Sequence, residues 1–353
     1  MPRSPERNDA TSPAKAVIAS SGIRLIYIGA MRLALAGLLL AACVQGGPAR
    51  SPTPTTAPSA SGVGTTASPT LAWRRIADIP TARSEVAAGI LRSVVYVVGG
   101  LGGGDVVETL VGDRWVTAPR YPLSVDHAMA AGIDTAGTPG LYVLGGNVNG
   151  ISTARSFRFF GADGWREIAS MPAPRSQGAA VAIGPKIYVV GGVNVDRLVS
   201  PTYVYDTAAD RWSTVAAIPT PRDHLAAAAL AGRVCAVGGR RLSLLQNLSS
   251  FECYDPAQDR WSAMPDAPTA RGGIGAAAFG GRLIVLGGEQ PAGTIAAVES
   301  FDSATGRWSR LPDLASPRHG LGVVAFGNTI LALAGGPVPG ATQTSFCEAL
   351  DLR

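Results

Sequence analysis

Charged residues are scarce in this chain, and lysine is almost missing. Only 16% of the 353 residues are charged, and Lys15 and Lys186 are the two lysines, so arginine supplies nearly all of the positive charge. Five basic and two acidic residues lie in residues 1–42, which leaves only +2 of the net charge of +5 for the rest of the chain. No run of basic residues occurs there, so we predict no nucleic-acid-binding surface.

Aromatic residues and helical periodicity are also low. Aromatic residues make up 6% of the chain, and no long stretch repeats apolar residues with a period of 3.6, which argues against a helical bundle. Hydrophobic residues, at 46%, are sufficient for a core, and 44 glycines suit tight turns. The composition therefore predicts an all-β domain built from many short strands.

A short apolar segment near the N-terminus has the layout of a secretory signal peptide. Arg32 precedes an apolar run that ends in Leu40-Ala41-Ala42-Cys43, and the run is too short to cross a bilayer as a helix. These four residues resemble the lipobox of bacterial lipoproteins, which implies cleavage before Cys43 and a diacylglycerol on its thiol. Met31 is the better initiator, so we interpret residues 1–42 as the signal peptide and residues 1–30 as a misassigned upstream extension.

Residues 43–70 are rich in Pro, Thr, Ser, Gly and Ala and have no apolar periodicity. A segment of this composition cannot build a core, so it is predicted to be a flexible tether between a lipidated Cys43 and a folded domain. We expect an extracytoplasmic protein that contacts a bacterial membrane through its lipid anchor only.

The rest of the chain is periodic. Pairs of glycines each end a short apolar run, and they recur at steps of 46, 46, 47, 49 and 48 residues. The pairs are Gly99-Gly100, Gly145-Gly146, Gly191-Gly192, Gly238-Gly239, Gly287-Gly288 and Gly335-Gly336. Tryptophan follows a similar period at Trp73, Trp115, Trp165, Trp212, Trp261 and Trp308. Each period has room for four short strands, which is the content of one propeller blade.

In three periods an aromatic-Asp pair and a turn precede the tryptophan, as in Tyr205-Asp206 before Trp212. Gly-Gly, Tyr-Asp and Trp at these offsets resemble the Kelch repeat over residues 73–353, and the predicted propeller domain is residues 71–353. The resemblance implies an all-β, six-bladed Kelch-type β-propeller. Because the last period stops without a Trp and Trp73 has no preceding period, the strand near Leu71 is predicted to complete the last blade. Blades 1 and 2 lack the aromatic-Asp pair, so their outer strands are expected to be irregular.

An arginine enters the first strand of five of the six blades: Arg83, Arg175, Arg222, Arg271 and Arg318. In blade 2 the slot falls on Val125. First strands line the central channel of a propeller, so these arginines are expected around one channel mouth, where they could bind an anion, a carboxylated sugar or an acidic peptide. The alternative is structural, with each guanidinium bonded to nearby carbonyls, and we favour it because the feature repeats.

The three histidines and one glutamate are the other candidates. His127 and His224 lie two residues after the arginine slot, whereas His319 lies one residue after it. This difference predicts that the three rings do not all point inward, so we predict no metal site and no cofactor. Asp126-His127 and Asp223-His224 are interpreted as pairs that orient each other. Glu289, directly after a glycine pair, is a weak candidate for a catalytic acid–base group; we favour a solvated loop residue.

With Cys43 lipidated, three cysteines remain. Cys235 and Cys253 fall on neighbouring strands of one predicted blade and are the candidate disulfide, because an odd number allows at most one pair. Free buried thiols are the alternative, which we favour slightly.

These features favour a membrane-anchored module that binds a protein or a carbohydrate through one propeller face, over an enzyme. The enzyme alternative stays open because propeller sites combine residues from several blades, although no Gly-x-Ser-x-Gly, His-Glu-x-x-His or Cys-x-x-Cys motif occurs. A six-bladed Kelch fold resembles the periplasmic sialic-acid mutarotases, and less closely the copper radical oxidases, which have seven blades. A scaffold for envelope proteins is the third alternative.

Overall fold

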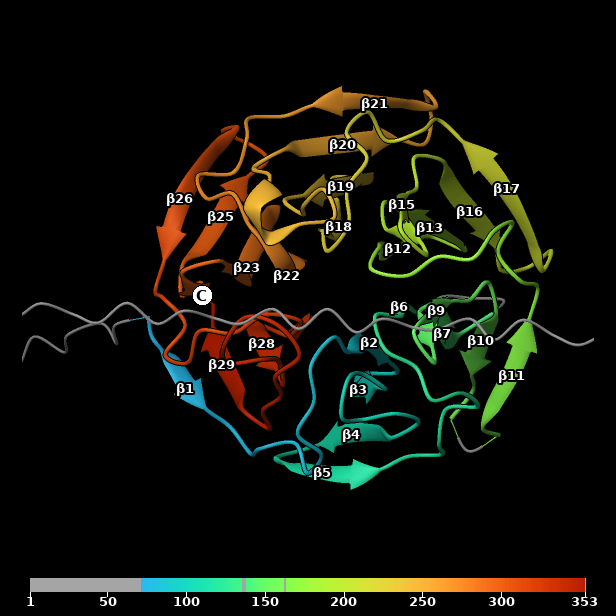
Figure 1. Cartoon of the computed structure of the whole chain (residues 1–353), viewed down its shortest axis with the longest axis horizontal. Coiled ribbons are helices and arrows are strands. Elements are labelled where there is room, and N and C mark those ends of the chain that lie inside the picture. The colour runs from blue at the N-terminus through green and yellow to red at the C-terminus, as the bar shows by residue number, and fades with distance from the viewer. Residues whose placement is uncertain (1–70, 135–137, 162, 353) are drawn as a thin grey trace, which may run out of the picture. The chain divides into compact units, whose positions relative to one another are not determined.

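The computed structural model describes residues 71–134, 138–161 and 163–352. Six antiparallel sheets stand in a ring and form a six-bladed β-propeller (Figure 1). Five of these sheets have four strands, and the sheet of blade 5 has a short fifth strand. The predicted signal peptide, lipidation site and tether lie outside the described residues.

Each blade runs from an inner to an outer strand. Blade 1 consists of β2 (Ala87–Leu91), β3 (Val94–Val98), β4 (Val107–Val111) and β5 (Arg114–Thr117). Blade 2 consists of β6 (Met129–Ile133), β7 (Gly140–Leu144), β10 (Ser156–Phe159) and β11 (Trp165–Ile168). Blade 3 consists of β12 (Ala179–Ile183), β13 (Lys186–Val190), β16 (Thr202–Asp206) and β17 (Arg211–Val215).

The remaining blades follow the same order. Blade 4 consists of β18 (Ala226–Leu230), β19 (Arg233–Val237), β20 (Phe251–Asp255) and β21 (Arg260–Ala263). Blade 5 consists of β22 (Gly272–Phe279), β23 (Arg282–Gln290), β25 (Val298–Asp302) and β26 (Arg307–Leu311). Blade 6 consists of β27 (Gly322–Phe326), β28 (Thr329–Leu333), β29 (Cys347–Asp351) and β1 (Trp73–Arg75). The outer strands of blades 1 and 2 are regular, so the predicted irregularity is wrong: pairing of backbone groups forms the hairpin without the aromatic-Asp pair.

The strand β1 closes the ring as the sequence predicts. It pairs antiparallel with β29, with Trp73 opposite Leu350 and Arg75 opposite Glu348. Closure by an N-terminal strand covers the edge of β29, which would otherwise present unpaired backbone groups.

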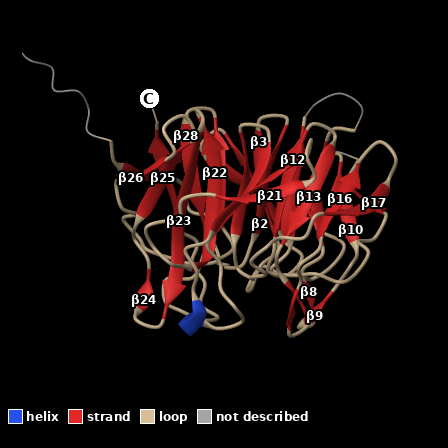
Figure 2. Cartoon of the chain, turned by 90° about the horizontal axis from the view of Figure 1, so that it is seen from above, coloured by secondary structure: helices blue, strands red, loops and turns tan. Residues whose placement is uncertain are grey.

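Short hairpins extend from the connections between second and third strands. They are β8 (Asn147–Val148) with β9 (Ile151–Ser152), β14 (Val193–Asn194) with β15 (Arg197–Leu198), and β24 (Gly293–Thr294) with β23. In blade 4 this connection contains the 3-10 turn η1 (Leu244–Gln246). Figure 2 shows β8, β9, β24 and the helical turn projecting from one side of the ring, which we call the loop face; the C-terminus lies on the opposite side. Within the described residues, no helix is long and apolar enough to cross a membrane.

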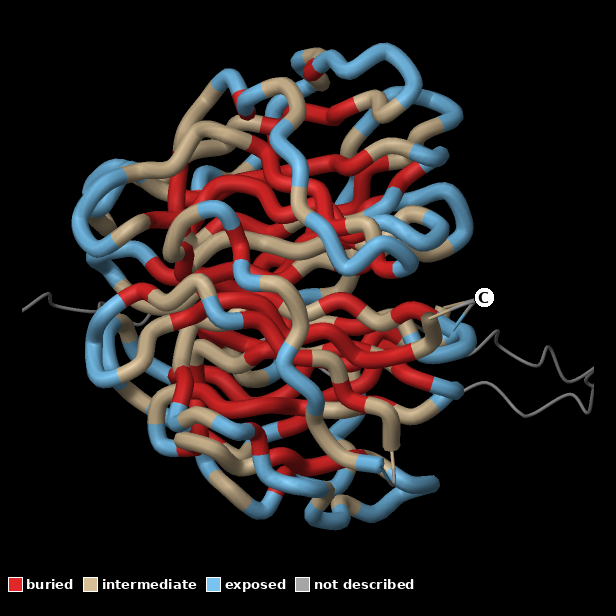
Figure 3. The backbone as a smooth tube through the Cα atoms, turned by 90° about the vertical axis from the view of Figure 1, so that its right-hand side faces the viewer, coloured by how far each residue is buried: buried red, intermediate tan, exposed pale blue. Residues whose placement is uncertain are grey.

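The core lies between the blades. Among the described residues, six hydrophobic clusters form, and each joins two neighbouring sheets, including blade 6 with blade 1. Buried backbone runs through the middle of the molecule and exposed backbone lies at the loops (Figure 3). Each of the six tryptophans donates its indole N–H to a backbone carbonyl near the outer strand of the preceding blade, at 2.7–2.9 Å. These contacts place each tryptophan between the outer parts of two neighbouring blades.

The glycine pair of the last blade is shifted by one residue from the predicted position. In blades 1, 4 and 5 the slot arginine bonds the carbonyl of the first glycine, 16 residues later. Arg318 instead bonds the carbonyl of Ala334, also 16 residues later. Ala334 and Gly335 have positive φ values of 55° and 109°, so they occupy the place of the pair and Gly336 is an additional residue.

Candidate functional site at the channel mouth

The five arginines that enter the first strands, which we call the slot arginines, contact groups inside the protein. All five are 0–1% exposed. Arg222 donates to the carbonyls of Gly238 at 2.6 Å and Ala236 at 3.0 Å, and its Nη1 lies 2.5 Å from Glu252. None of these five guanidinium groups therefore reaches the channel surface, and they do not form the expected arginine-lined mouth.

The partners of these arginines are buried glutamates on the third strand of the same blade. The pairs are Arg83 with Glu108, Arg222 with Glu252, Arg271 with Glu299 and Arg318 with Glu348. In blade 3 the guanidinium of Arg175 lies 4.1 Å from the ring centroid of Tyr203 instead. Burial lowers the pKa of Arg83 and of Arg175 to about 10, which leaves both charged at neutral pH.

The mouth of the channel on the loop face is formed by the residues two positions after the arginine slot. All six have left-handed backbones, with φ between 51° and 70°. They are Glu85, His127, Gln177, His224, Gly273 and Gly320. Their backbones form a ring: each N–H from His127 onward donates to the carbonyl of the preceding member at 2.8–3.1 Å, and the N–H of Val86 closes the ring on Gly320 at 3.4 Å.

Four members of this ring are not glycine, although left-handed φ is uncommon for residues with a side chain. A small cavity of about 80 Å³ lies at the ring and is lined by all four of these side chains. Farther along the channel, away from the loop face, it is lined mostly by small residues of the six first strands. The ring thus places polar side chains at one point on the axis of the molecule.

The three histidines gather at this mouth, but His127 and His224 line the cavity and His319 does not. The three rings therefore do not all point inward, as the register difference predicts. His127 and His224 meet edge to face, with ring centroids 5.1 Å apart. Nε2 of His127 lies 3.4 Å from one oxygen of Glu85, and Nδ1 of His319 lies 3.1 Å from the other. Blade 6 has Gly320 in the ring, and His319 reaches Glu85 from the preceding position.

The predicted Asp-His pairs are confirmed. Nδ1 of His127 lies 2.6 Å from Asp126, and Nδ1 of His224 lies 2.5 Å from Asp223. Arg240, on the loop of blade 4, donates to Nε2 of His224 at 2.9 Å. Because Nε2 accepts this bond, His224 is neutral in this arrangement and its proton is on Nδ1.

Glu289 belongs to the same cluster, so the solvated-loop interpretation is wrong. Its side chain is 3% exposed. Its oxygens contact Nη1 of Arg240 at 2.7 Å and the backbone N–H of Gly340 at 2.9 Å, and His319 lies 3.7 Å away. Glu289 is thus held by groups from blades 4 and 6 rather than facing solvent.

Burial and neighbouring charges shift the pKa values of the groups in this cluster. Burial opposes ionisation of Glu85, but His127 and His319 hold its pKa well below the usual range. Burial likewise opposes a charge on His127 and on His319, yet Glu85 raises the pKa of both. Burial lowers the pKa of His224, in agreement with its neutral state.

Sequence reasoning missed Glu85 and Arg240. Glu85 lies two residues after the arginine slot, as His127 and His224 do, so alignment of the periods at this slot would have found it. Arg240 follows a glycine pair directly, as Glu289 does. Their convergence depends on the ring closing blade 1 onto blade 6, which periodicity does not show.

The loop face around the cluster carries exposed apolar side chains. Five large hydrophobic residues there are more than half exposed: Ile151, Val195, Leu242, Leu245 and Val338. They lie on the loops that join second to third strands in blades 2, 3, 4 and 6. On the opposite face, the turns expose Val111 of blade 1 and Phe326 of blade 6.

Cys235 and Cys253 form a disulfide between directly opposed residues of β19 and β20, so the preference for free thiols is wrong. Cys347 is free and buried.

Comparison with known proteins supports this architecture. A family model described as "Kelch motif" matches residues 174–218, 221–268 and 270–315, which are blades 3, 4 and 5. The chain is similar to "Kelch repeat and BTB domain-containing protein 1" of camelpox virus (strain CMS), with 29% identity over 143 residues, covering 38% of this chain and 25% of the relative. It is also similar to "Kelch repeat-containing protein kel-10" of Caenorhabditis elegans, with 30% identity over 138 residues, covering 36% and 24%.

The chain therefore spans about a quarter of the length of the curated relatives it matches. Among solved structures, "Structure of YjhT" superposes with a TM-score of 0.66 at 16% identity, covering 78% of this chain and 95% of that one. At that identity the likeness shows the fold alone.

Proposed function

We propose that this chain, a Kelch-repeat β-propeller, is a protein-binding module that recognises its partner with the loop face. The observation that carries the proposal is the set of exposed apolar loop residues on that face. Leu245, in η1, is 83% exposed, and Val195, in the turn between β14 and β15, is 65% exposed. Several exposed apolar side chains on one face suit a protein interface, because contiguous exposed apolar surface marks interaction sites.

A protein partner fits this face better than an acidic sugar does. The carbohydrate hypothesis depended on accessible guanidinium groups, and the slot arginines are 0–1% exposed. Loops of varied sequence on a rigid scaffold are common carriers of specificity. The viral and nematode relatives also contain Kelch repeats, as their names state.

A site-specific cross-linking experiment tests the loop face. A photo-reactive residue at Leu245, on the loop face, is compared with one at Val111, which is 55% exposed on the opposite face. We expect a discrete adduct from Leu245 only, and we expect Val195→Asp to abolish it by placing a charge in the interface. Equal adducts from both positions, or an adduct that Val195→Asp leaves unchanged, would rule out recognition by these loops.

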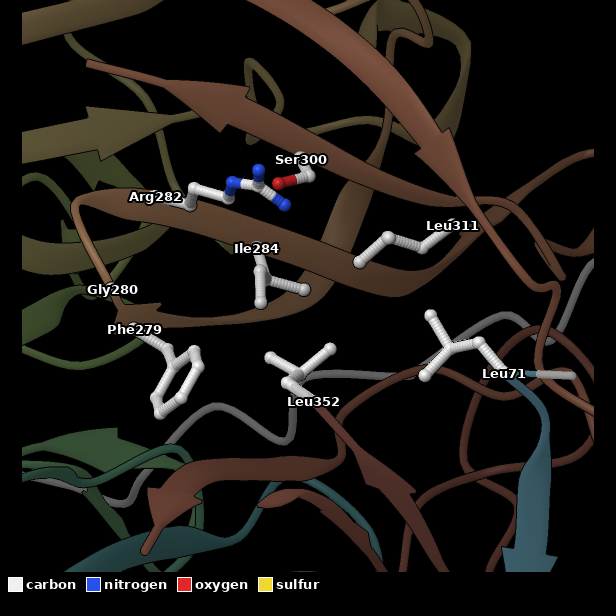
Figure 4. Close-up of a pocket in the computed structure, with 8 residues that line it drawn as sticks. All are labelled: Leu71, Phe279, Gly280, Arg282, Ile284, Ser300, Leu311 and Leu352. Atoms are coloured by element: carbon white, nitrogen blue, oxygen red, sulfur yellow. The ribbon is translucent and has the colours of Figure 1, made fainter. Parts of the chain in front are cut away.

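We further propose that the protein is extracytoplasmic and is anchored by a lipid on Cys43. The Cys235–Cys253 disulfide supports an oxidising compartment, where such bonds persist. Leu71, the first described residue, lines a cavity of about 360 Å³ with Leu352 and Phe279 (Figure 4). Phe279 is the last residue of β22, at the end of that strand on the face opposite the loop face. A tether joined at Leu71 would leave the loop face free to bind.

Membrane fractionation of the producing bacterium tests the anchor. The full chain should sediment with membranes, whereas Cys43→Ser should release it into the soluble fraction. Cys347→Ser serves as the matched control, because that thiol is buried in the propeller. Wild-type protein in the soluble fraction, or Cys43→Ser retained in the membrane fraction, would exclude the lipid anchor.

A further inference from the structure

We propose that the channel mouth binds one divalent transition-metal ion, best matched by Zn²⁺, through Glu85, His127 and His224. This site is separate from the proposed protein interface and does not depend on it. One ligand atom from each of the three residues lies within 4.8 Å of the other two. Two imidazole nitrogens and one carboxylate oxygen form a donor set that Zn²⁺ uses, with a fourth position left open.

The two histidines are oriented as metal ligands usually are. Asp126 and Asp223 each hold an Nδ1 atom, at 2.6 and 2.5 Å, so Nε2 is the nitrogen left for an ion. A carboxylate on the second ring nitrogen fixes the ring and raises its basicity. Asp223 is itself fixed, because its other oxygen accepts the backbone N–H of Leu242 at 2.7 Å.

The charge of the cluster also favours a cation. Four carboxylates gather here, on Glu85, Asp126, Asp223 and Glu289, whereas Arg240 is the one arginine or lysine with an ion pair to the cluster among the described residues. The side chains of Asp223 and Glu289 are 1–3% exposed, so solvent screens them little. A divalent ion would offset most of the excess negative charge.

The cavity gives an ion access and room for a further ligand. It is lined by the three proposed ligands and by Gln177, and it continues to Gly273 and Gly320, where the ring has no side chain. The second group of potential ligands, Glu85 with Glu289 and His319, is less available. Nε2 of His319 lies 3.1 Å from the carbonyl of Val338, and the oxygens of Glu289 contact Arg240 and Gly340.

Binding of the ion replaces two contacts, the hydrogen bond from Arg240 to His224 and the 3.4 Å contact between Nε2 of His127 and Glu85. Nε2 of His224 gives up the hydrogen bond from Arg240 and takes the metal in its place. Arg240 keeps its contacts to Glu289 at 2.7 Å and to Asp223 at 3.4 Å. Glu85 binds the ion through the oxygen nearer His127 and keeps its contact to His319 through the other.

Metal binding is measured on the tag-free full chain after chelator treatment and dialysis. Titration with Zn²⁺ is followed by calorimetry, and the bound metal is counted by mass spectrometry after gel filtration. We expect one Zn²⁺ per chain, and we expect Co²⁺ to give the intense visible bands of a four-coordinate site. Absence of stoichiometric Zn²⁺ binding by the wild-type chain would overturn the proposal without any variant.

Variants locate the ion. His127→Gln and His224→Gln should each abolish stoichiometric binding, and Asp223→Asn should weaken it about 10–100-fold. Gln177→Ala is the matched control, because Gln177 occupies the same ring position in blade 3 and its backbone bonds remain. Unchanged melting temperatures of the metal-free variants check the fold. Full binding by the His127→Gln, His224→Gln double variant, or loss of binding with His319→Gln instead, would overturn the assignment.

Discussion

At the scale of residues, the repeat carries a matched pair of side chains. The arginine slot faces the second residue of the third strand. Four blades combine arginine with glutamate there, and blade 3 combines Arg175 with Tyr203. Blade 2 has Val125 and Phe157, both in one hydrophobic cluster. The two residues of the pair differ together from blade to blade, because a buried charge without a partner is unfavourable.

Arg222→Val should lower the free energy of unfolding by about 3–5 kcal/mol, because it leaves Glu252 buried without its partner. The double variant Arg222→Val, Glu252→Phe reproduces the pair of blade 2 and should be more stable than the single variant. Urea unfolding of the three proteins measures the difference. A double variant that is no more stable than Arg222→Val would show that the ion pair is not the reason for the loss.

At the scale of elements, turns hold neighbouring blades together. Asp210, in the turn between β16 and β17 of blade 3, accepts the backbone N–H of Ala169 in blade 2 at 2.8 Å. It also accepts the hydroxyl of Tyr205 at 2.6 Å. Asp259 makes the same two contacts between blades 4 and 3, to Ala216 and Tyr254. The tryptophans link the same outer strands, so each blade is joined to the preceding one by polar contacts as well as by apolar packing.

These contacts make the turn sensitive to acid. The Tyr205 hydroxyl and the Ala169 N–H hold the pKa of Asp210 below its ordinary 3.8. Its contribution to stability is therefore present above pH 3.8 and is lost as the pH falls through the folded-state pKa. Asp210→Asn should destabilise the protein at neutral pH, and the difference from wild type should shrink in acid. Unfolding midpoints at several pH values test this, and a difference independent of pH would contradict it.

At the scale of the whole molecule, stability depends on closure of the ring. Removing residues 71–79 deletes β1 and the buried Ile79 and exposes the edge of β29. We expect a lower melting temperature and association of chains through that edge. Light scattering and thermal unfolding against the intact chain measure both effects. A monomeric truncated protein with the melting temperature of the intact chain would show that β1 is dispensable.

The sequence by itself determined the number of blades, their four strands, the closing strand and the place of each tryptophan. These features repeat along the chain, and a period specifies local pairing of neighbouring strands. It also placed the slot arginines correctly on the chain, but their direction depends on packing, since burial against glutamates on the third strand turns them away from the channel. The sequence also did not show the one-residue shift in blade 6. Gly335-Gly336 looks like the glycine pair of the other blades, although Ala334 and Gly335 occupy that place.

Only the tertiary structure decided the site. Glu85 and His319 are 234 residues apart, and they meet because blade 6 closes onto blade 1. His127, His224, Arg240 and Glu289 join them from three further blades, each on a connection that has its own local sequence. Contacts between the blades of a closed ring are set by its geometry, so the period gives these residues matching positions but does not show which of their side chains meet.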